Sequence, residues 1–122
     1  MARINEIYKC GVCGTVVSVI EAKGDVSCCN EPMKLLEENT EENEKHTPVL
    51  TVEGEKIKVK VGSVEHPMED EHWIELIQLM KDDKVIFEKR LYPGEKPEAE
   101  FLVEGEGITV RELCNLHGLW KS

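Results

Sequence analysis

The residues best suited to chemistry in this sequence are its cysteines and histidines. Cys114 and His117 lie three positions apart, directly after an apolar segment that ends at Leu113. A thiolate and an imidazole at this spacing are typical of half a metal site. The other half must come from the remaining histidines, because the other cysteines lie far upstream in a group of their own. The sequence therefore predicts one metal site with these ligands: His46, His66, His72, Cys114 and His117.

The upstream group consists of Cys10, Cys13 and the adjacent pair Cys28 and Cys29. Four thiolates within a short segment suit a tetrahedral site for zinc or for iron. Most short four-cysteine modules hold structural zinc. Two adjacent cysteines must strain the tetrahedron, however, and an electron-transfer iron tolerates such distortion. The spacing alone leaves iron and zinc about equally favoured.

Four imidazoles and one thiolate make an unusual site for structural zinc, which prefers four ligands. Five protein ligands suit a metal with an open sixth position, and iron fits that description. Blue copper is the alternative, because blue-copper proteins are also β-sandwiches with Cys and His near the C-terminus. Their weak axial methionine follows the last histidine. Only residues 118–122 follow His117 here, and none of them is methionine.

The formal net charge of -10 and the pI near 4.9 argue against a nucleic-acid partner, whose phosphates require a basic surface. Such a chain also repels small anions on average. Glu44 and Lys45 directly precede His46. In one interpretation Lys45 places a cation where a small anion approaches the open metal position, and Glu44 offers a carboxylate to the same position. In the other, both are ordinary solvated charges.

The elements that must position these residues are short strands. The lysines at 56, 58 and 60 alternate with apolar residues, which is the pattern of a half-buried strand. Helical periodicity is weak throughout, and turn residues separate the apolar segments, including 81–84 and 104–107. About six or seven such strands predict an antiparallel β-sandwich of the immunoglobulin-like kind. The expected strands are 7–9, 15–20, two from 48 onward, 73–80, 85–90, 98–103 and 108–113.

The composition divides the chain at an acidic segment of Glu and Asn, interrupted only by Thr40. We expect a four-cysteine module at residues 1–36, an acidic linker and active-site loop at 37–45, and the sandwich at 46–122. The module is shorter than the roughly 40 residues that a hydrophobic core alone can stabilise, so it needs a metal or disulfides.

The start of the chain has no apolar signal segment, and no apolar segment approaches the roughly 18 residues of a membrane span. A cytoplasmic location without membrane contact is therefore expected. The odd number of cysteines in a reducing compartment favours metal ligands over disulfides.

The motifs in order are CxxCG, CCxxPMKLL, EKHTP, HPMxxxHWI and CNLHGLW. Together they resemble desulfoferrodoxin, the two-iron class of superoxide reductase, and the resemblance runs through both predicted domains. One departure is Asn30, where the family often has glycine after the cysteine pair. Because asparagine tolerates a positive φ, we expect the turn to survive.

The resemblance implies a desulforedoxin-like, rubredoxin-type iron at the four upstream cysteines. It implies a second iron with the four histidines equatorial and Cys114 axial. Glu44 and Lys45 match loop residues that the family places beside the open position.

The implied activity is one-electron reduction of superoxide to hydrogen peroxide, with the four-cysteine iron as electron relay or store. A rubredoxin-like donor and a homodimer are the implied partners. Two alternatives are a non-catalytic two-iron electron-transfer protein, which would not react with superoxide, and a zinc-stabilised binding module, which would be colourless.

Overall fold

The computed structural model describes residues 2–103 and 106–122, and every regular element in them is a β-strand. The chain divides into two compact units, Met1–Glu37 and Glu38–Ser122. This agrees with the predicted fold class: a small four-cysteine module followed by a β-sheet domain. Across the described residues, no helix has the length and apolar character needed to cross a membrane.

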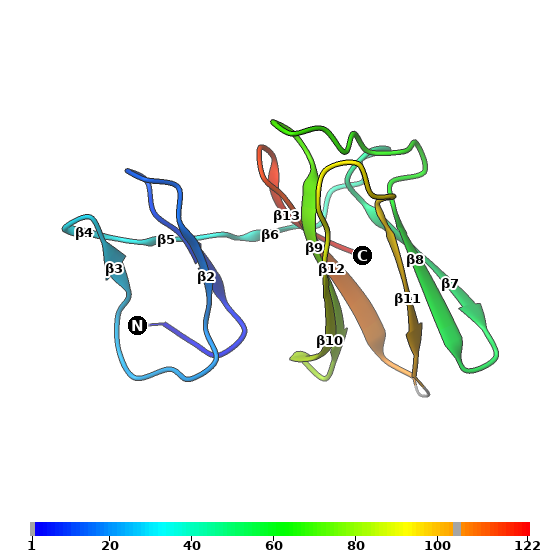
Figure 1. Cartoon of the computed structure of the whole chain (residues 1–122). Coiled ribbons are helices and arrows are strands. Elements are labelled where there is room, and N and C mark those ends of the chain that lie inside the picture. Colours follow the sequence, from blue (N-terminus) through cyan, green and yellow to red (C-terminus); the bar gives the residue numbers. More distant parts are fainter. Residues whose placement is uncertain (1, 104–105) are drawn as a thin grey trace. The chain divides into compact units, whose positions relative to one another are not determined.

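The first unit contains a three-stranded sheet and a separate hairpin (Figure 1). The sheet has the order β2-β1-β5, with β1 antiparallel to both neighbours. The buried apolar residues of this unit are few, namely Ala2, Ile7, Val19 and Met33, and Cys10 is buried as well. The bounds are β1 (Ile7–Lys9), β2 (Val16–Ser18), β5 (Lys34–Leu35) and, for the hairpin, β3 (Ser27–Cys28) and β4 (Glu31–Pro32).

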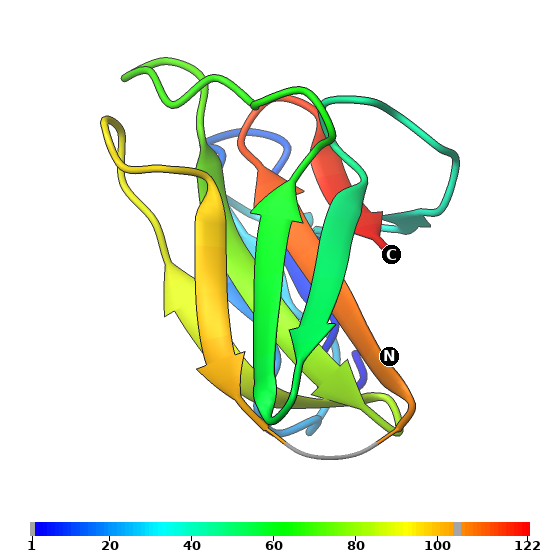
Figure 2. The ribbon, with the colours of Figure 1, turned by 90° about the vertical axis from the view of Figure 1, so that its right-hand side faces the viewer.

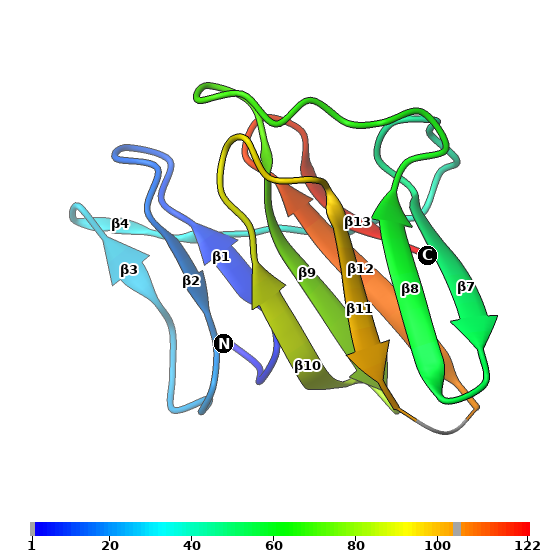
Figure 3. The same ribbon diagram turned by 45° about the vertical axis from the view of Figure 1, so that its right-hand side comes forward.

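The second unit is a sandwich of two sheets. Figure 2 shows the three-stranded sheet in front of the larger one, and Figure 3 shows the same two sheets from an oblique angle. All pairings are antiparallel except β13 with β6. The five-stranded sheet runs β10 (Lys84–Arg90), β9 (Ile74–Lys81), β12 (Ile108–Cys114), β13 (Gly118–Lys121), β6 (Glu38–Asn39), and the other sheet runs β11 (Glu98–Leu102), β8 (Lys56–Val61), β7 (Pro48–Glu53).

The core lies between these sheets, and the period-two pattern of β8 explains its formation. Alternate residues of a strand point to opposite faces. Ile57, Val59 and Val61 are therefore buried in the core cluster, while the lysines between them face outward. Lys58 pairs there with Glu53 and Glu100 of the neighbouring strands. The first residue of β9, Ile74, and the last residue of β12, Cys114, also belong to this core, so the loops next to them start from buried positions.

The predicted strands of the sandwich are confirmed to within a residue or two, as is the hairpin turn between β9 and β10. Asp82 and Asp83 there both have a positive φ, as a two-residue hairpin loop requires. The turn predicted at 104–107 falls partly outside the described residues. Two strands of the second unit were not expected, β6 in the acidic segment and β13 after His117, and neither were the two-residue strands β3, β4 and β5 of the first unit. Neither β6 nor β13 has a distinctive pattern of apolar residues in the sequence. The strand β6 consists of two exposed residues, which are held by backbone hydrogen bonds to β13. The Asn39 side-chain amide also donates to the Leu119 carbonyl at 3.0 Å.

Candidate metal centres

The four upstream cysteines form one cluster in the first unit. One ligand atom from each lies within 4.8 Å of the others, and all four cysteines are free. The Cys10 sulfur accepts hydrogen bonds from the backbone amides of Val12 and Cys13, both at 3.4 Å. These two amides, Cys13 first, lower the pKa of Cys10. The local backbone therefore favours a thiolate at this position.

Sulfur crowding makes this cluster suited to a cation. Thr15 Oγ1 lies 3.1 Å from the Cys13 sulfur and is the main cause that lowers the pKa of Cys13 to about 6. The Cys13 and Cys28 sulfurs are 3.6 Å apart, and this neighbour raises the pKa of Cys28 to about 12. Four thiolates cannot share so small a space without a positive charge among them. A tetrahedral metal supplies that charge.

The turn of the β3–β4 hairpin presents the adjacent cysteine pair. Ser27 pairs with Pro32 and Cys28 with Glu31, which leaves Cys29 and Asn30 as the two loop residues. Their φ values are 54° and 61°. Two positive φ values in sequence are the geometry of the tight hairpin turn that glycine or asparagine favours. The expectation that Asn30 preserves the turn is confirmed, and Cys29 shares its left-handed conformation.

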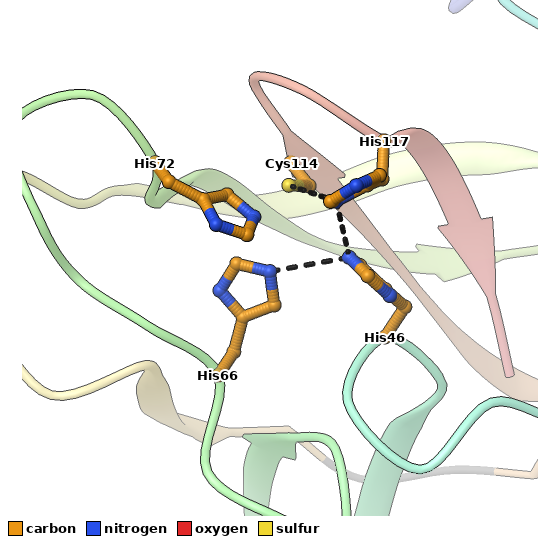
Figure 4. Close-up of side chains that lie close together, drawn as sticks. All are labelled: His46, His66, His72, Cys114 and His117. Carbon is orange, nitrogen blue, oxygen red and sulfur yellow. Dashed lines mark hydrogen bonds between the residues drawn. The ribbon is translucent and has the colours of Figure 1, made fainter.

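The four histidines and Cys114 form the second cluster, at one edge of the sandwich (Figure 4). His46 lies in the turn before β7, and His66 and His72 lie in the segment between β8 and β9. Cys114 is the last residue of β12, and His117 lies in the turn before β13. All five ligand atoms lie within 4.8 Å of one another. The structure thus brings together residues that are up to 71 positions apart in the sequence.

The four imidazoles close a ring around a common centre. Neighbouring centroids are 4.7 to 4.9 Å apart with interplanar angles of 69° to 80°, in the cyclic order His46, His66, His72, His117. Figure 4 shows their edges directed inward and the Cys114 sulfur to one side. That sulfur lies 3.6 Å from His117 Nδ1. Four imidazole nitrogens and one sulfur gathered in this way could together hold one metal ion.

A hydrogen bond on the outer side of the His66 ring determines which of its nitrogens faces inward. His66 Nδ1 donates to the Pro67 carbonyl at 2.7 Å, so its Nε2 is the bare nitrogen. That Nε2 lies 3.2 Å from His46 Nε2, which is 3.1 Å from His117 Nδ1. Among the described residues, His72 Nε2 is buried with no hydrogen-bond partner. A buried lone nitrogen beside three others fits a metal ion at their centre.

The electrostatics favour neutral imidazoles at this site. Burial, followed by the charges of His66 and His117, lowers the pKa of His46 to about 4. Burial also lowers the pKa of His66. Burial raises the pKa of Cys114, and the backbone amides of Leu116 and His117 act in the opposite direction. Neutral imidazoles are the form that binds metal, and a cation at the centre would favour the Cys114 thiolate.

The sequence matches the models of two families over nearly its whole described length. Residues 2–36 match "Desulfoferrodoxin, N-terminal domain", and residues 38–122 match "Desulfoferrodoxin". The chain belongs to the desulfoferrodoxin family. The curated desulfoferrodoxin of Nitratidesulfovibrio vulgaris is 52% identical over 120 residues, covering 96% of this chain and 94% of that protein. A desulfoferrodoxin homolog of Archaeoglobus fulgidus is 49% identical and covers 100% of this chain and 99% of that one.

Solved structures of superoxide reductases share this fold. The enzyme from Treponema pallidum superposes with a TM-score of 0.78 at 30% identity, covering 96% of both chains. The superoxide reductase from Nanoarchaeum equitans has a TM-score of 0.57 at 34% identity, covering 70% of this chain and 96% of that one. The resemblance seen in the motifs is therefore confirmed for both parts of this desulfoferrodoxin.

The predicted residues Glu44 and Lys45 lie in the loop that leads into His46, with both side chains exposed. Val64 donates its backbone amide to the Glu44 carbonyl at 2.9 Å, which ties this loop to the turn after β8. Burial and the neighbouring histidines have larger effects on the pKa of His46 and of His66 than Lys45 has. The positive charge of Lys45 lowers both pKa values slightly further. In residues 2–103 and 106–122, neither the Glu44 carboxylate nor the Lys45 ammonium forms a hydrogen bond or an ion pair. Both are free to meet a ligand.

Three residues that support the histidine centre of this desulfoferrodoxin were not identified from the sequence. The Trp120 ring stacks on His46 at 4.8 Å and 18°, and its Nε1 donates to the His117 carbonyl at 3.0 Å. The Asn115 side chain accepts from the Trp73 amide and donates to the Glu71 carbonyl. Asn43 lies against His46. Asn115 and Trp120 lie within the CNLHGLW motif, and their closeness in the sequence to Cys114 and His117 was the one signal that could have indicated a supporting role.

A buried carboxyl group lies behind Cys114. Val110 and Cys114 face the core, so the alternation of β12 turns Glu112 the same way. Both Glu112 carboxyl oxygens are buried without a hydrogen-bond partner among the described residues, and burial raises its pKa to about 9. Burial therefore favours the uncharged acid at this position.

Proposed function

We propose that this desulfoferrodoxin is a superoxide reductase that converts superoxide to hydrogen peroxide by one-electron reduction at an iron held by the second cluster. The closed ring of four imidazoles with the Cys114 sulfur on one side is the observation that carries this proposal. A metal held by these five donors would have room for one further small ligand. The names of the similar solved structures support the same activity.

The proposed ligands are His46, His66 and His72 through Nε2, His117 through Nδ1, and Cys114 through sulfur. Iron bound there would supply the electron for the reduction, and the Cys114 thiolate would increase its electron density. The protein's part is to hold the ring of imidazoles rigid. The hydrogen bond from His66 to Pro67 and the stacking of Trp120 on His46 do so.

Glu44 and Lys45 are the proposed catalytic residues beside the ligand position. The unpaired ammonium of Lys45 attracts a small anion that the net charge of -10 repels on average. The Glu44 carboxylate offers a ligand or proton-relay group to the same position. The acidic segment 37–45 would then serve both as the join between domains 1–36 and 46–122 and as the active-site loop.

The four-cysteine cluster is the proposed site of a second iron, which relays or stores electrons. Its thiolates favour a metal, and the amide hydrogen bonds to Cys10 would adjust the potential of that iron. A rubredoxin-like protein is the proposed donor, and the free thiols agree with a reducing, cytoplasmic location.

A homodimer is the proposed assembly. The first unit has only a small core and leaves large apolar side chains exposed on its surface. A second copy of this unit would cover them. These residues are Ile4, Val12, Ile20 and Leu35.

The deciding experiment mixes the anaerobically iron-loaded, reduced protein with superoxide and measures hydrogen peroxide and oxygen. Peroxide without oxygen, with one electron lost per superoxide, is expected. Cys114→Ser is the matched variant, and it should lose the thiolate-to-iron absorption of the oxidised protein. Iron-loaded protein that ignores superoxide would instead favour the non-catalytic electron-transfer alternative.

A further inference from the structure

The side chain of Asn43 organises the turn that carries His46. Its Oδ1 accepts hydrogen bonds from the backbone amides of Lys45, at 2.9 Å, and of His46, at 3.1 Å. The Asn43 amide in turn donates to Thr47 Oγ1 at 2.8 Å, and the Thr47 amide donates to the Asn43 carbonyl at 3.0 Å. The five-residue turn is thus closed from both ends by Asn43 and Thr47.

The same oxygen also contacts the His46 ring. Asn43 Oδ1 lies 3.1 Å from His46 Nδ1. Two backbone amides point at this atom, and an amide nitrogen cannot accept from them, so the atom is the carbonyl oxygen of the side chain. It can therefore only accept from the ring as well. Nδ1 must carry the hydrogen, and Nε2 is left as a bare lone pair within the ring of imidazoles.

We infer that Asn43 is the positioning residue of the histidine centre, and that its Oδ1 couples Nδ1 of the His46 ring to the backbone amides of Lys45 and His46, at the end of the loop that holds Glu44 and Lys45. The inference rests on the proposed function for the role of that loop. Through this atom, the tautomer and ring plane of His46 and the placement of the two loop residues depend on one another. Asn43 acts through His46 and does not touch the substrate position itself.

This role predicts different effects for two substitutions. Asn43→Asp preserves an acceptor for both backbone amides but puts a carboxylate on the Nδ1 hydrogen, which makes the imidazole a stronger donor. Asn43→Ala removes the acceptor, so either tautomer of His46 becomes available and the turn loses its cap.

The test uses full-length protein loaded with iron at both sites. Spectroelectrochemical titration gives the reduction potential of the histidine centre, and competition with a chelator gives its affinity for iron. Asn43→Asp should lower the potential and move the thiolate-to-iron band to higher energy. Asn43→Ala should weaken iron binding by about tenfold to a hundredfold. Thr40→Asp is the matched control, because Thr40 is exposed in the same acidic segment and the substitution adds the same charge.

Equal potentials for Asn43→Asp and Thr40→Asp, with iron affinity unchanged in Asn43→Ala, would overturn the inference. If Asn43→Ala does not fold by circular dichroism, the Asp variant decides alone, since it retains the turn. None of these measurements uses superoxide. Wild-type protein that ignores superoxide while Asn43→Asp shows the lowered potential would refute the proposed function and support the role of Asn43.

Discussion

At the scale of single residues, backbone conformation matters as much as ligand chemistry. The adjacent cysteines both belong to the four-cysteine cluster, and the turn that presents them requires a left-handed conformation at Cys29 and Asn30, with φ values of 54° and 61°. Outside glycine, such a conformation is favourable mainly for asparagine and aspartate. The sequence allowed this to be expected for Asn30, because its side chain is known to tolerate a positive φ. It did not indicate Cys29, whose conformation is imposed by the hairpin.

Asn30→Ala should therefore destabilise the first unit by about 1 kcal/mol, because alanine is strained at a positive φ. The measurement is the temperature at which the four-cysteine iron chromophore bleaches. Asn30→Gly is the matched control and should bleach at or slightly above the wild-type temperature. Equal bleaching temperatures for the alanine and glycine variants would mean that the turn relaxes out of the left-handed conformation.

At the scale of elements, the loop that carries Glu44 and Lys45 is positioned by a close approach of two backbones. Gly62 has a φ of 80°, and a Cβ there would lie 2.5 Å from the Val64 carbonyl oxygen and 2.6 Å from that of Glu44. Only glycine allows this approach. The hydrogen bond from the Val64 amide to the Glu44 carbonyl depends on it.

Gly62→Ala should lower the free energy of unfolding by about 3 kcal/mol, through backbone strain and the displacement of the 43–46 loop. Gly54→Ala is the control, because Gly54 also has a positive φ of 62° but open space around it, so only about 1 kcal/mol should be lost. Urea unfolding of the zinc-free, iron-free protein measures both. A similar loss of unfolding free energy in the two variants would show that the close approach of Gly62 to the loop does not contribute to stability.

The sequence predicted the strands of the sandwich and the grouping of the nine candidate ligands into two clusters better than the contacts that support them. Alternating residues such as those of β8 reveal a strand by themselves, and cysteines and histidines are rare enough to be grouped by type. The hydrogen bond from His46 to Asn43 and the packing of Trp120 on His46 depend on how the folded chain brings side chains together. No pattern of neighbouring residues in the sequence indicates them. The short strand β6 was hidden for the same reason, since its stability comes from its neighbour β13.

At the scale of the whole molecule, the two units differ in how much core they possess. The second has a continuous apolar core between two sheets, whereas the first buries only a few apolar side chains. A unit of fewer than about 40 residues needs further stabilisation, which a bound metal provides.

Removal of metal from both sites should therefore unfold the first unit and leave the second folded. Amide hydrogen exchange of the metal-free protein, kept reduced, is the measurement. Amides of β1 and β2 should exchange rapidly, while those of β9 and β12 stay protected. Protection of β1 and β2 without metal would show that this small core suffices alone.

The net charge of the molecule sets the last expectation. A chain with a formal charge of -10 slows the approach of an anion, and Lys45 counters this only near the metal centre. Lys45→Ala should lower the second-order rate constant with superoxide by about tenfold at low salt and reduce its dependence on ionic strength. Stopped-flow measurement across ionic strengths tests this.

Lys60→Ala is the control, because Lys60 is an exposed lysine of β8 and its loss removes the same charge from the outer face of the sandwich. If both variants slow the reaction equally, net charge governs the rate; a larger effect of Lys45 shows that the rate depends on a cation placed beside the centre.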